Sequence, residues 1–240
     1  PLAMLLGLLA LLAGLVARAD DRPFLRTTTA AVDDDNARTL ELHLGRLSGK
    51  KIGASRLQMG YSLTPQLNVE VELESIRDRF ETSSTRDREL ALWVSWVEPQ
   101  REGWGLSSRM SIGQERENAQ DTEVSKGHTY ARGVGALSLI RPDLWLHANL
   151  GLQWDASSQR TGHWRGVWSL AMEQTLHGQT HWFAELAATG QQSLAFAGLR
   201  QWLRKGKVAM DLGGGRQTLG TSLGQTPFVS ISLSLYEIPL

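Results

Sequence analysis

The chain contains no cysteine among its 240 residues. That absence excludes a disulfide framework, thiolate metal sites and a cysteine nucleophile, and it is compatible with export into an oxidising compartment. Acidic and basic residues are balanced at 25 each, which excludes an electrostatic nucleic-acid binder. Beyond residue 19 there is no run of 18 apolar residues, so no membrane-spanning helix is expected.

The beginning of the chain has the pattern of an export signal. An apolar run over residues 4–16 is too short to span a bilayer, and residues 17–19 form a small-x-small cleavage site. We therefore predict a signal peptide over residues 1–19, with a retained anchor helix as the alternative. Residues 20–37 carry two acidic clusters without a hydrophobic period, and are expected to form an irregular periplasmic leader before a barrel over residues 38–240.

The segment from Leu67 to Glu74 alternates strictly between apolar and polar residues. On a β-strand this places all apolar side chains on one face and all polar side chains on the other. The pattern recurs in about twelve segments of roughly ten residues, the length that a tilted strand needs to cross the hydrocarbon layer. The expected strands lie near residues 38–48, 52–63, 67–78, 87–98, 103–114, 128–140, 144–154, 163–175, 180–189, 194–204, 207–214 and 227–237.

Short and long connections alternate between these segments, from the tight 64–66 to the long, charged 115–127. Short periplasmic turns and longer outer loops produce such alternation, whereas a Greek-key sandwich does not require it. The sequence thus predicts an all-β fold, an up-and-down antiparallel transmembrane β-barrel of about twelve strands with both termini in the periplasm.

The alternation also assigns an outer and an inner face. The inner face carries many ionisable residues, which a dry core could not hold. Water or a paired polar network is therefore expected in the lumen. The expected lipid-facing residues include Leu44, Leu90, Leu92, Trp96, Leu150, Leu152, Trp164, Trp168, Leu170, Leu186, Val208, Met210, Leu212, Val229, Ile231, Leu233 and Leu235. The residues expected to line the lumen or pore are Glu41, His43, Glu70, Glu72, Glu74, Arg109, His147, Arg165, Glu173, His181, Glu185 and Asp211.

Segments 128–140 and 194–204 are apolar on both faces, so each is expected to carry a bulge or to fail to span. Trp96, Trp104 and Trp164 lie near expected strand ends, where aromatic girdles meet the membrane interfaces.

The three carboxylates of Glu70, Glu72 and Glu74 stack roughly 7 Å apart on one strand face. They would either favour cations in a pore or pair with arginines such as Arg109, Arg165 or Arg200, and both outcomes remain open.

No pattern of catalytic residues emerges. The chain has neither a Gly-x-Ser-x-Gly elbow nor a His-x-Ser-Asn stretch, so a serine hydrolase would depend on a histidine such as His128 meeting a serine across strands. His147, His163 and His181 lie on separate strands without ligand spacing, which predicts no metal and no cofactor. We expect the chain not to be an enzyme.

Three short elements near the start carry a family resemblance. Arg22-Pro23-Phe24, residues 27–32 and Leu40-Glu41-Leu42 resemble the opening of the outer-membrane barrels of the MetA-pathway phenol-degradation family and its transporter-like relatives. In that family Thr-Asp-Asp-Ala follows the first element, whereas threonines stand here in place of the aspartates. The resemblance covers residues 22–42 and implies transport of small, often aromatic molecules, without catalytic residues.

Residues 228–236 resemble the C-terminal signal read by the barrel-insertion machinery, although the chain continues past Tyr236. The sequence as a whole predicts a porin-like passive channel or transporter in the outer membrane of a Gram-negative bacterium. Its expected partners are outer-membrane lipid and lipopolysaccharide, a small-molecule solute and the insertion machinery, but no nucleic acid. The alternatives are a lipid-active barrel enzyme, an acyl hydrolase, and a structural or adhesive barrel with a plugged lumen.

Overall fold

The computed structural model describes residues 39–48, 52–64, 66–78, 83–98, 102–119, 126–157, 160–190, 192–218 and 225–239. The predicted signal peptide and leader, residues 1–37, lie outside the described residues. Within the described part, no helix is long and apolar enough to cross a membrane. The strands are β1 (Thr39–Ser48), β2 (Ile52–Thr64), β3 (Leu67–Asp78), β4 (Ser83–Val97), β5 (Trp104–Ala119), β6 (Lys126–Arg141), β7 (Leu144–Ser157), β8 (Arg160–His177), β9 (Thr180–Thr189), β10 (Gln192–Arg204), β11 (Val208–Thr218) and β12 (Gln225–Pro239).

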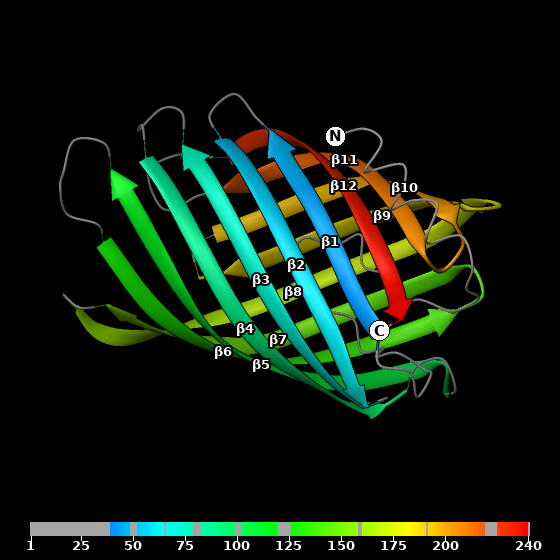
Figure 1. The fold of residues 1–240 in the computed structure, drawn as a ribbon, viewed down its shortest axis with the longest axis horizontal. Helices are drawn as coiled ribbons and strands as arrows, with labels where there is room; N and C mark the ends of the chain where they lie inside the picture. Colours follow the sequence, from blue (N-terminus) through cyan, green and yellow to red (C-terminus); the bar gives the residue numbers. More distant parts are fainter. Residues whose placement is uncertain are drawn as a thin grey trace.

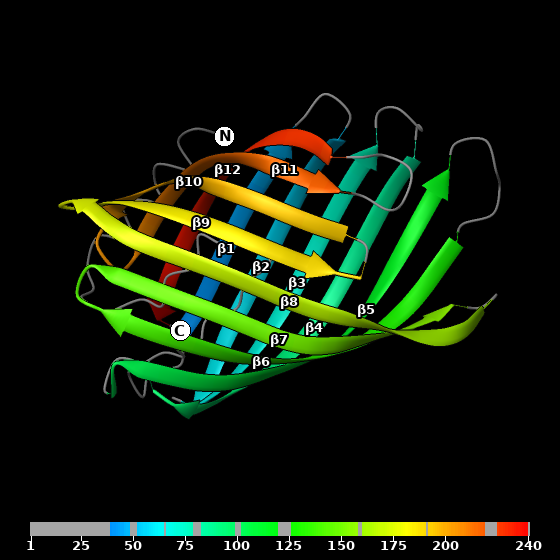
Figure 2. The ribbon, with the colours of Figure 1, turned by 180° about the vertical axis from the view of Figure 1, so that it is seen from behind.

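These twelve strands of the described chain form one closed barrel (Figure 1). Each strand runs antiparallel to its sequence neighbours, and β1 closes the ring against β12 from Thr39↔Pro239 to Ser48↔Val229. The reverse view shows the β6–β9 wall crossing in front of β1–β4 at a steep angle (Figure 2). The predicted up-and-down antiparallel transmembrane barrel of about twelve strands is confirmed.

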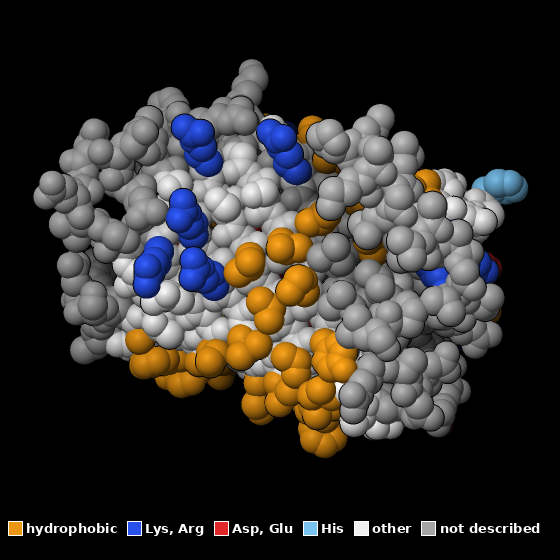
Figure 3. Space-filling model, viewed as in Figure 1, with side chains coloured by type: hydrophobic (Ala, Val, Ile, Leu, Met, Phe, Trp, Pro, Cys, Tyr) orange, Lys and Arg blue, Asp and Glu red, His pale blue; other side chains and the backbone are white. Residues whose placement is uncertain are grey.

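The barrel wall has an apolar outside because alternate residues of each strand point outward, and most of those residues are hydrophobic. On β3, Val71 and Leu73 are exposed on the outer face, whereas Glu70 is 3% exposed on the inner face. Leu150 and Met110 are similarly exposed on β7 and β5. Hydrophobic side chains gather in a band across the outer surface (Figure 3). Such a continuous apolar exterior requires lipid around it.

Several strands extend further than the sequence predicted. Much of the expected loop 115–127 is strand, because β5 continues to Ala119 and β6 begins at Lys126. Antiparallel pairing persists there, for example in Arg86↔Arg116. Beyond the hydrocarbon layer both faces of a strand meet water, so the hydrophobic alternation disappears although backbone pairing continues. The predicted loop was wrong for that reason.

The two strands with mixed patterns, β6 and β10, both belong to the closed wall. β6 pairs without a register shift, whereas β10 has a single irregularity between Trp202 and Arg204. Near that irregularity Val208 and Leu235 pair with each other and are buried, although both were expected to face lipid. Neighbours Ala209 and Tyr236 are buried as well, so the two-faced alternation is lost at this end of the wall.

Candidate functional site

An arginine on β5 organises the polar lining of the barrel. Arg109 Nη2 donates to Glu70 Oε1 on β3 at 2.6 Å, and Arg109 Nη1 donates to Glu89 on β4. All three side chains are buried, and the guanidinium carbon lies 5.8 Å from the centre of the Trp93 ring. Alternation places these side chains on the inner face of adjacent strands, so one cation joins three strands of the wall.

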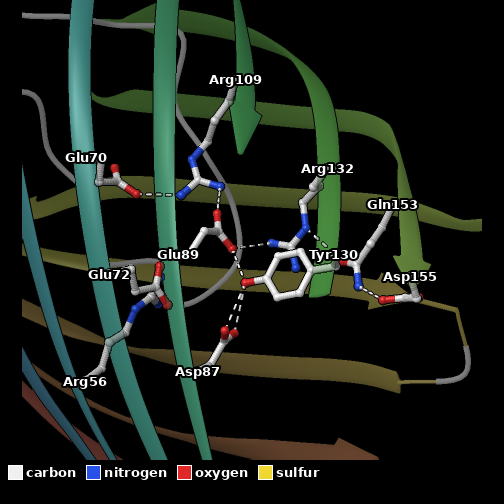
Figure 4. Close-up of polar contacts among 10 residues, drawn as sticks. All are labelled: Arg56, Glu70, Glu72, Asp87, Glu89, Arg109, Tyr130, Arg132, Gln153 and Asp155. Carbon is white, nitrogen blue, oxygen red and sulfur yellow. Dashed lines mark hydrogen bonds and ion pairs between the residues drawn. The ribbon is translucent and has the colours of Figure 1, made fainter. Parts of the chain in front are cut away.

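Tyr130 on β6 extends this network. Its hydroxyl lies 2.6 Å from Glu89 Oε2 and 3.0 Å from Asp87 Oδ2 on β4. The Arg132 guanidinium stacks 5.2 Å from the tyrosine ring centre, and its Nη1 lies 3.6 Å from Glu89 Oε2. The network therefore crosses the inner wall from β3 to β6 (Figure 4).

The same line of polar contacts continues onto β7 and β8. Arg132 Nε donates to Gln153 Oε1 at 2.9 Å, and Gln153 Nε2 donates to Asp155 Oδ1 at 2.7 Å. Asp155 then pairs with Arg165 on β8, where Arg165 Nε lies 2.8 Å from Oδ2. Inward-facing polar groups thus connect six consecutive strands, β3 to β8. Because the charges are paired and hydrogen-bonded, they can be buried away from bulk water.

The acidic strand β3 has a second arginine partner on β2. Arg56 Nη2 donates to Glu72 Oε2 at 2.6 Å, and Arg56 lies directly opposite Glu74 in the strand register. Of the two outcomes left open for the glutamates of β3, pairing with arginine thus holds for Glu70 and Glu72. The arginines that pair with them are Arg109 and Arg56, whereas Arg165 pairs with Asp155 and Arg200 with Asp211.

A second polar cluster lies on β10 to β12. Arg200, which is fully buried, donates from Nε to Asp211 Oδ1 at 2.7 Å and from Nη2 to Tyr236 Oη at 3.2 Å. Ser232 donates to the other oxygen of Asp211 at 2.9 Å. The guanidinium also lies 5.2 Å from the centre of the Trp202 ring. Carboxylate, hydroxyl and aromatic ring together compensate for burial of the arginine charge.

Phenylalanines line the inner face of the same wall. Phe183, Phe196 and Phe228 are buried, with ring centres 5.2 Å and 5.6 Å apart. Glycines on the neighbouring strands make room for the rings, since a Cβ atom at Gly198 would lie 2.6 Å from Phe183 Cζ and one at Gly213 2.6 Å from Phe196 Cε2. The inner wall thus has a charged arc over β2–β8, whereas over β9–β12 these three rings form an aromatic arc beside the Arg200–Asp211 cluster.

Two histidines make short inward contacts. His181 Nδ1 lies 2.7 Å from Glu173 Oε1, and His147 Nδ1 lies 2.7 Å from the hydroxyl oxygen of Ser138 on the neighbouring strand. Ser138 is fully buried and His147 is 3% exposed. Ser138 and His147 belong to the inner face, because their sequence neighbours Leu137 and Leu146 are exposed on the outside.

The structure places most of the predicted lining residues on the inner face. Glu70, Arg109, His147, Glu173, Glu185 and Asp211 are buried there, and Glu72, Glu74, Arg165 and His181 are half-buried. The side chains of Glu41 and His43 lie outside the described residues. Within the described residues, no group of three or more metal-ligating side chains is arranged to hold an ion.

Sequence reasoning missed part of this network. Arg56, Asp87, Tyr130 and Arg132 were not among the predicted lining residues, although three of them bind carboxylates in it. Asp87 lies two residues before Glu89 and so on the same strand face, a pattern from which its inward position could have been predicted. Tyr130 and Arg132 lie on the strand whose two faces are both partly apolar, so parity alone did not assign them.

A scan against family models finds no match, and a search of curated proteins finds none either. Solved structures do match. The KdgM porin superposes with a TM-score of 0.54 at 8% identity, covering 81% of this chain and 98% of that chain. The NanC porin gives a TM-score of 0.55 at 11% identity, covering 82% of this chain and 98% of that chain.

The chain has the fold of an outer-membrane porin barrel. At these identities the likeness shows the fold alone. Because no family model matches, the resemblance of residues 22–42 to the MetA-pathway barrels stays a prediction.

Proposed function

We propose that the protein is an outer-membrane channel of a Gram-negative bacterium, through which small solutes pass along the polar side of the lumen. The observation that carries this proposal is the inward chain of charged and polar side chains over β3–β8 in a barrel with an apolar exterior. A purely structural barrel would gain nothing from so many buried charges, since well-packed apolar residues stabilise as well or better.

The charge of the lining favours cations and neutral solutes over anions. The inward carboxylates are those of Glu70, Glu72, Glu74, Asp87, Glu89, Glu115, Asp155, Glu173, Glu185 and Asp211. The inward arginines are Arg56, Arg109, Arg132, Arg165 and Arg200. Carboxylates therefore outnumber guanidinium groups, and rings of acidic side chains select cations in pores.

The aromatic arc supports a narrower solute class. Phe183, Phe196 and Phe228 offer flat apolar surface opposite the charged arc by strand order. The resemblance to MetA-pathway barrels implies small aromatic cargo, which such rings would contact well. The KdgM porin has been solved in complex with disordered oligogalacturonate. The carboxylate excess in the present lumen makes a polyanion of that kind a poor solute here.

Acyl hydrolysis is less well supported. Ser138 and His147 form the contact that a serine nucleophile and its base require. Both side chains face the lumen and are buried, whereas lipid acyl chains lie against the outer wall. A lipid ester in the bilayer therefore has no access to the hydroxyl oxygen.

Conductance in planar lipid bilayers tests the proposal directly. The purified, refolded barrel should give discrete current steps, and the reversal potential in a KCl gradient should report preference for K⁺ over Cl⁻. Absence of current from protein that is folded by circular dichroism would overturn the channel and favour a barrel with a plugged lumen.

A further inference from the structure

Five arginines on the adjoining strands β1 to β5 face outward at one end of the barrel. Arg46 on β1, Arg77 on β3, Arg86 and Arg88 on β4, and Arg116 on β5 are all exposed. None of the five guanidinium groups forms an ion pair or hydrogen bond with a described residue. Figure 3 shows basic side chains grouped beside the hydrophobic band of the outer wall.

The positive charges of these arginines repel one another. Arg86 and Arg116 are directly opposite each other in the strand register, and Arg88 lies two residues from Arg86 on the same face, about 7 Å away. Like charges directly opposite each other on a sheet are destabilising. The carboxylates nearest in sequence, such as Asp87 and Glu115, occupy inward positions of the same strands. Among the described residues no carboxylate neutralises the outer cluster, so an anion from outside the chain would be stabilised there.

A groove in the outer wall adjoins the arginines. It has a volume of about 720 Å³, and Arg46, Arg86 and Arg88 contribute to its lining. Leu44, Leu57 and Leu73 form part of its apolar surface, together with Met210, Ile231 and Leu233.

Two carboxylates, Glu74 and Asp87, also reach this lining. Both come from inward positions, and Asp87 accepts a hydrogen bond from Tyr130. The groove thus combines a surface for hydrocarbon with a cationic border.

The cluster belongs to the end of the barrel opposite Thr39 and Pro239, where the first strand begins and the last strand ends. Arg77 is next to the last residue of β3, and Arg116 and Arg46 lie within three residues of the ends of β5 and β1. The tight turns at 142–143 and 178–179 belong to the other end, as do Thr39 and Pro239. With Thr39 and Pro239 on the periplasmic side, as the proposed outer-membrane location requires, the cluster lies in the outer leaflet.

We propose that this groove and its five arginines bind a phosphorylated glycolipid of the outer leaflet, with lipopolysaccharide as the probe. Guanidinium groups bind phosphate oxygens in bidentate fashion, and a lipid carrying several phosphates neutralises the opposed pair Arg86 and Arg116. The acyl chains of that lipid lie along the leucines of the groove. The inference rests on the proposed location, but it does not depend on whether the lumen conducts.

The test compares two double variants of the full barrel. Arg86→Gln/Arg116→Gln removes the opposed pair, and Arg141→Gln/Lys205→Gln removes two exposed positive charges at the other end. Each protein is reconstituted in phosphatidylcholine nanodiscs with increasing lipopolysaccharide, and bound lipopolysaccharide and thermal midpoint are measured. We expect about tenfold weaker binding for the first variant and unchanged binding for the second. Lipopolysaccharide without its lipid A phosphates should bind the natural protein as weakly as intact lipopolysaccharide binds the Arg86→Gln/Arg116→Gln variant.

A second readout separates binding from folding. Without anionic lipid, Arg86→Gln/Arg116→Gln should unfold at the same temperature as the natural protein or higher, because repulsion is removed. In lipopolysaccharide its midpoint should fall below that of the natural protein. Equal binding by both variants, or equal binding of the dephosphorylated lipid, would overturn the proposal. Bilayer conductance of the same variants reports on the channel separately, so either idea can fail alone.

Discussion

Arg109 on β5 reaches across β4 to donate a 2.6 Å hydrogen bond to Glu70 on β3. On its way the guanidinium passes over Trp93, the residue directly opposite Arg109 on β4. A second hydrogen bond to Glu89 completes the pairing. The side chain thus fixes the spacing of three strands at one level of the inner wall, where the two carboxylates would otherwise repel each other.

Replacing this arginine should destabilise the barrel strongly. Arg109→Met leaves the buried carboxylates of Glu70 and Glu89 without their shared cation, and breaking a buried ion pair costs about 3–5 kcal/mol. Urea unfolding in lipid vesicles, followed by tryptophan fluorescence, measures the loss. Arg132→Met is the control, since Arg132 is half-buried and lies 3.6 Å from Glu89. An equal loss for both variants would show that Arg109 has no special role.

The Tyr130 ring needs a glycine opposite it. Tyr130 and Gly113 face each other on β6 and β5, and a Cβ atom at Gly113 would lie 2.6 Å from Tyr130 Cε1. Gly113→Ala should therefore destabilise by about 1–3 kcal/mol through overpacking. The double variant Gly113→Ala/Tyr130→Ala should show less than the sum of the two single losses, because the clash is gone. Additive losses would contradict the proposed contact.

The aromatic arc should limit the bore. Phe196→Ala removes the central ring of three neighbouring phenylalanines, so single-channel conductance should rise while stability falls by about 3–5 kcal/mol. Leu199→Ala, on the outer face of the same strand, is the matched control and should leave conductance unchanged. Unchanged conductance in Phe196→Ala would place the permeation path elsewhere.

Ion preference should depend on the inward glutamates. Glu72→Gln/Glu74→Gln removes two lumenal carboxylates next to Arg56, which should reduce the K⁺ to Cl⁻ permeability ratio because fewer negative charges attract cations. The reversal potential in a salt gradient measures the ratio. Arg88→Gln changes charge on the outer face and should leave it unchanged. A ratio that moves equally in both variants would argue against selection by the lumen.

The sequence predicted strand number, direction and face well, because one residue in two must be apolar wherever a strand meets lipid. Leu90, Leu92 and Leu150 are exposed on the outer face as expected. Strand ends were less accessible to this reasoning. Above the hydrocarbon layer, positions such as Arg86 and Arg116 still pair, but hydrophobicity no longer marks which face they occupy.

Inner contacts depend on facts that strand parity does not contain. Parity placed Glu70 and Arg109 on the same side of the wall, but their contact depends on the register between β3, β4 and β5. Phe196 was hidden because β10 is apolar on both faces, inside through the aromatic arc and outside through lipid contact. The register that brings Gly213 under Phe196 is a property of the assembled sheet.

The pairing of β1 with β12 also governs how the protein can assemble. Without that last ladder, two rows of amide and carbonyl groups would face hydrocarbon, where each unsatisfied group costs several kcal/mol. A partly assembled sheet is thus untenable in the bilayer interior. Insertion must therefore end with β1 and β12 hydrogen-bonded to each other. A chain lacking either strand should be degraded rather than persist as a barrel with fewer strands.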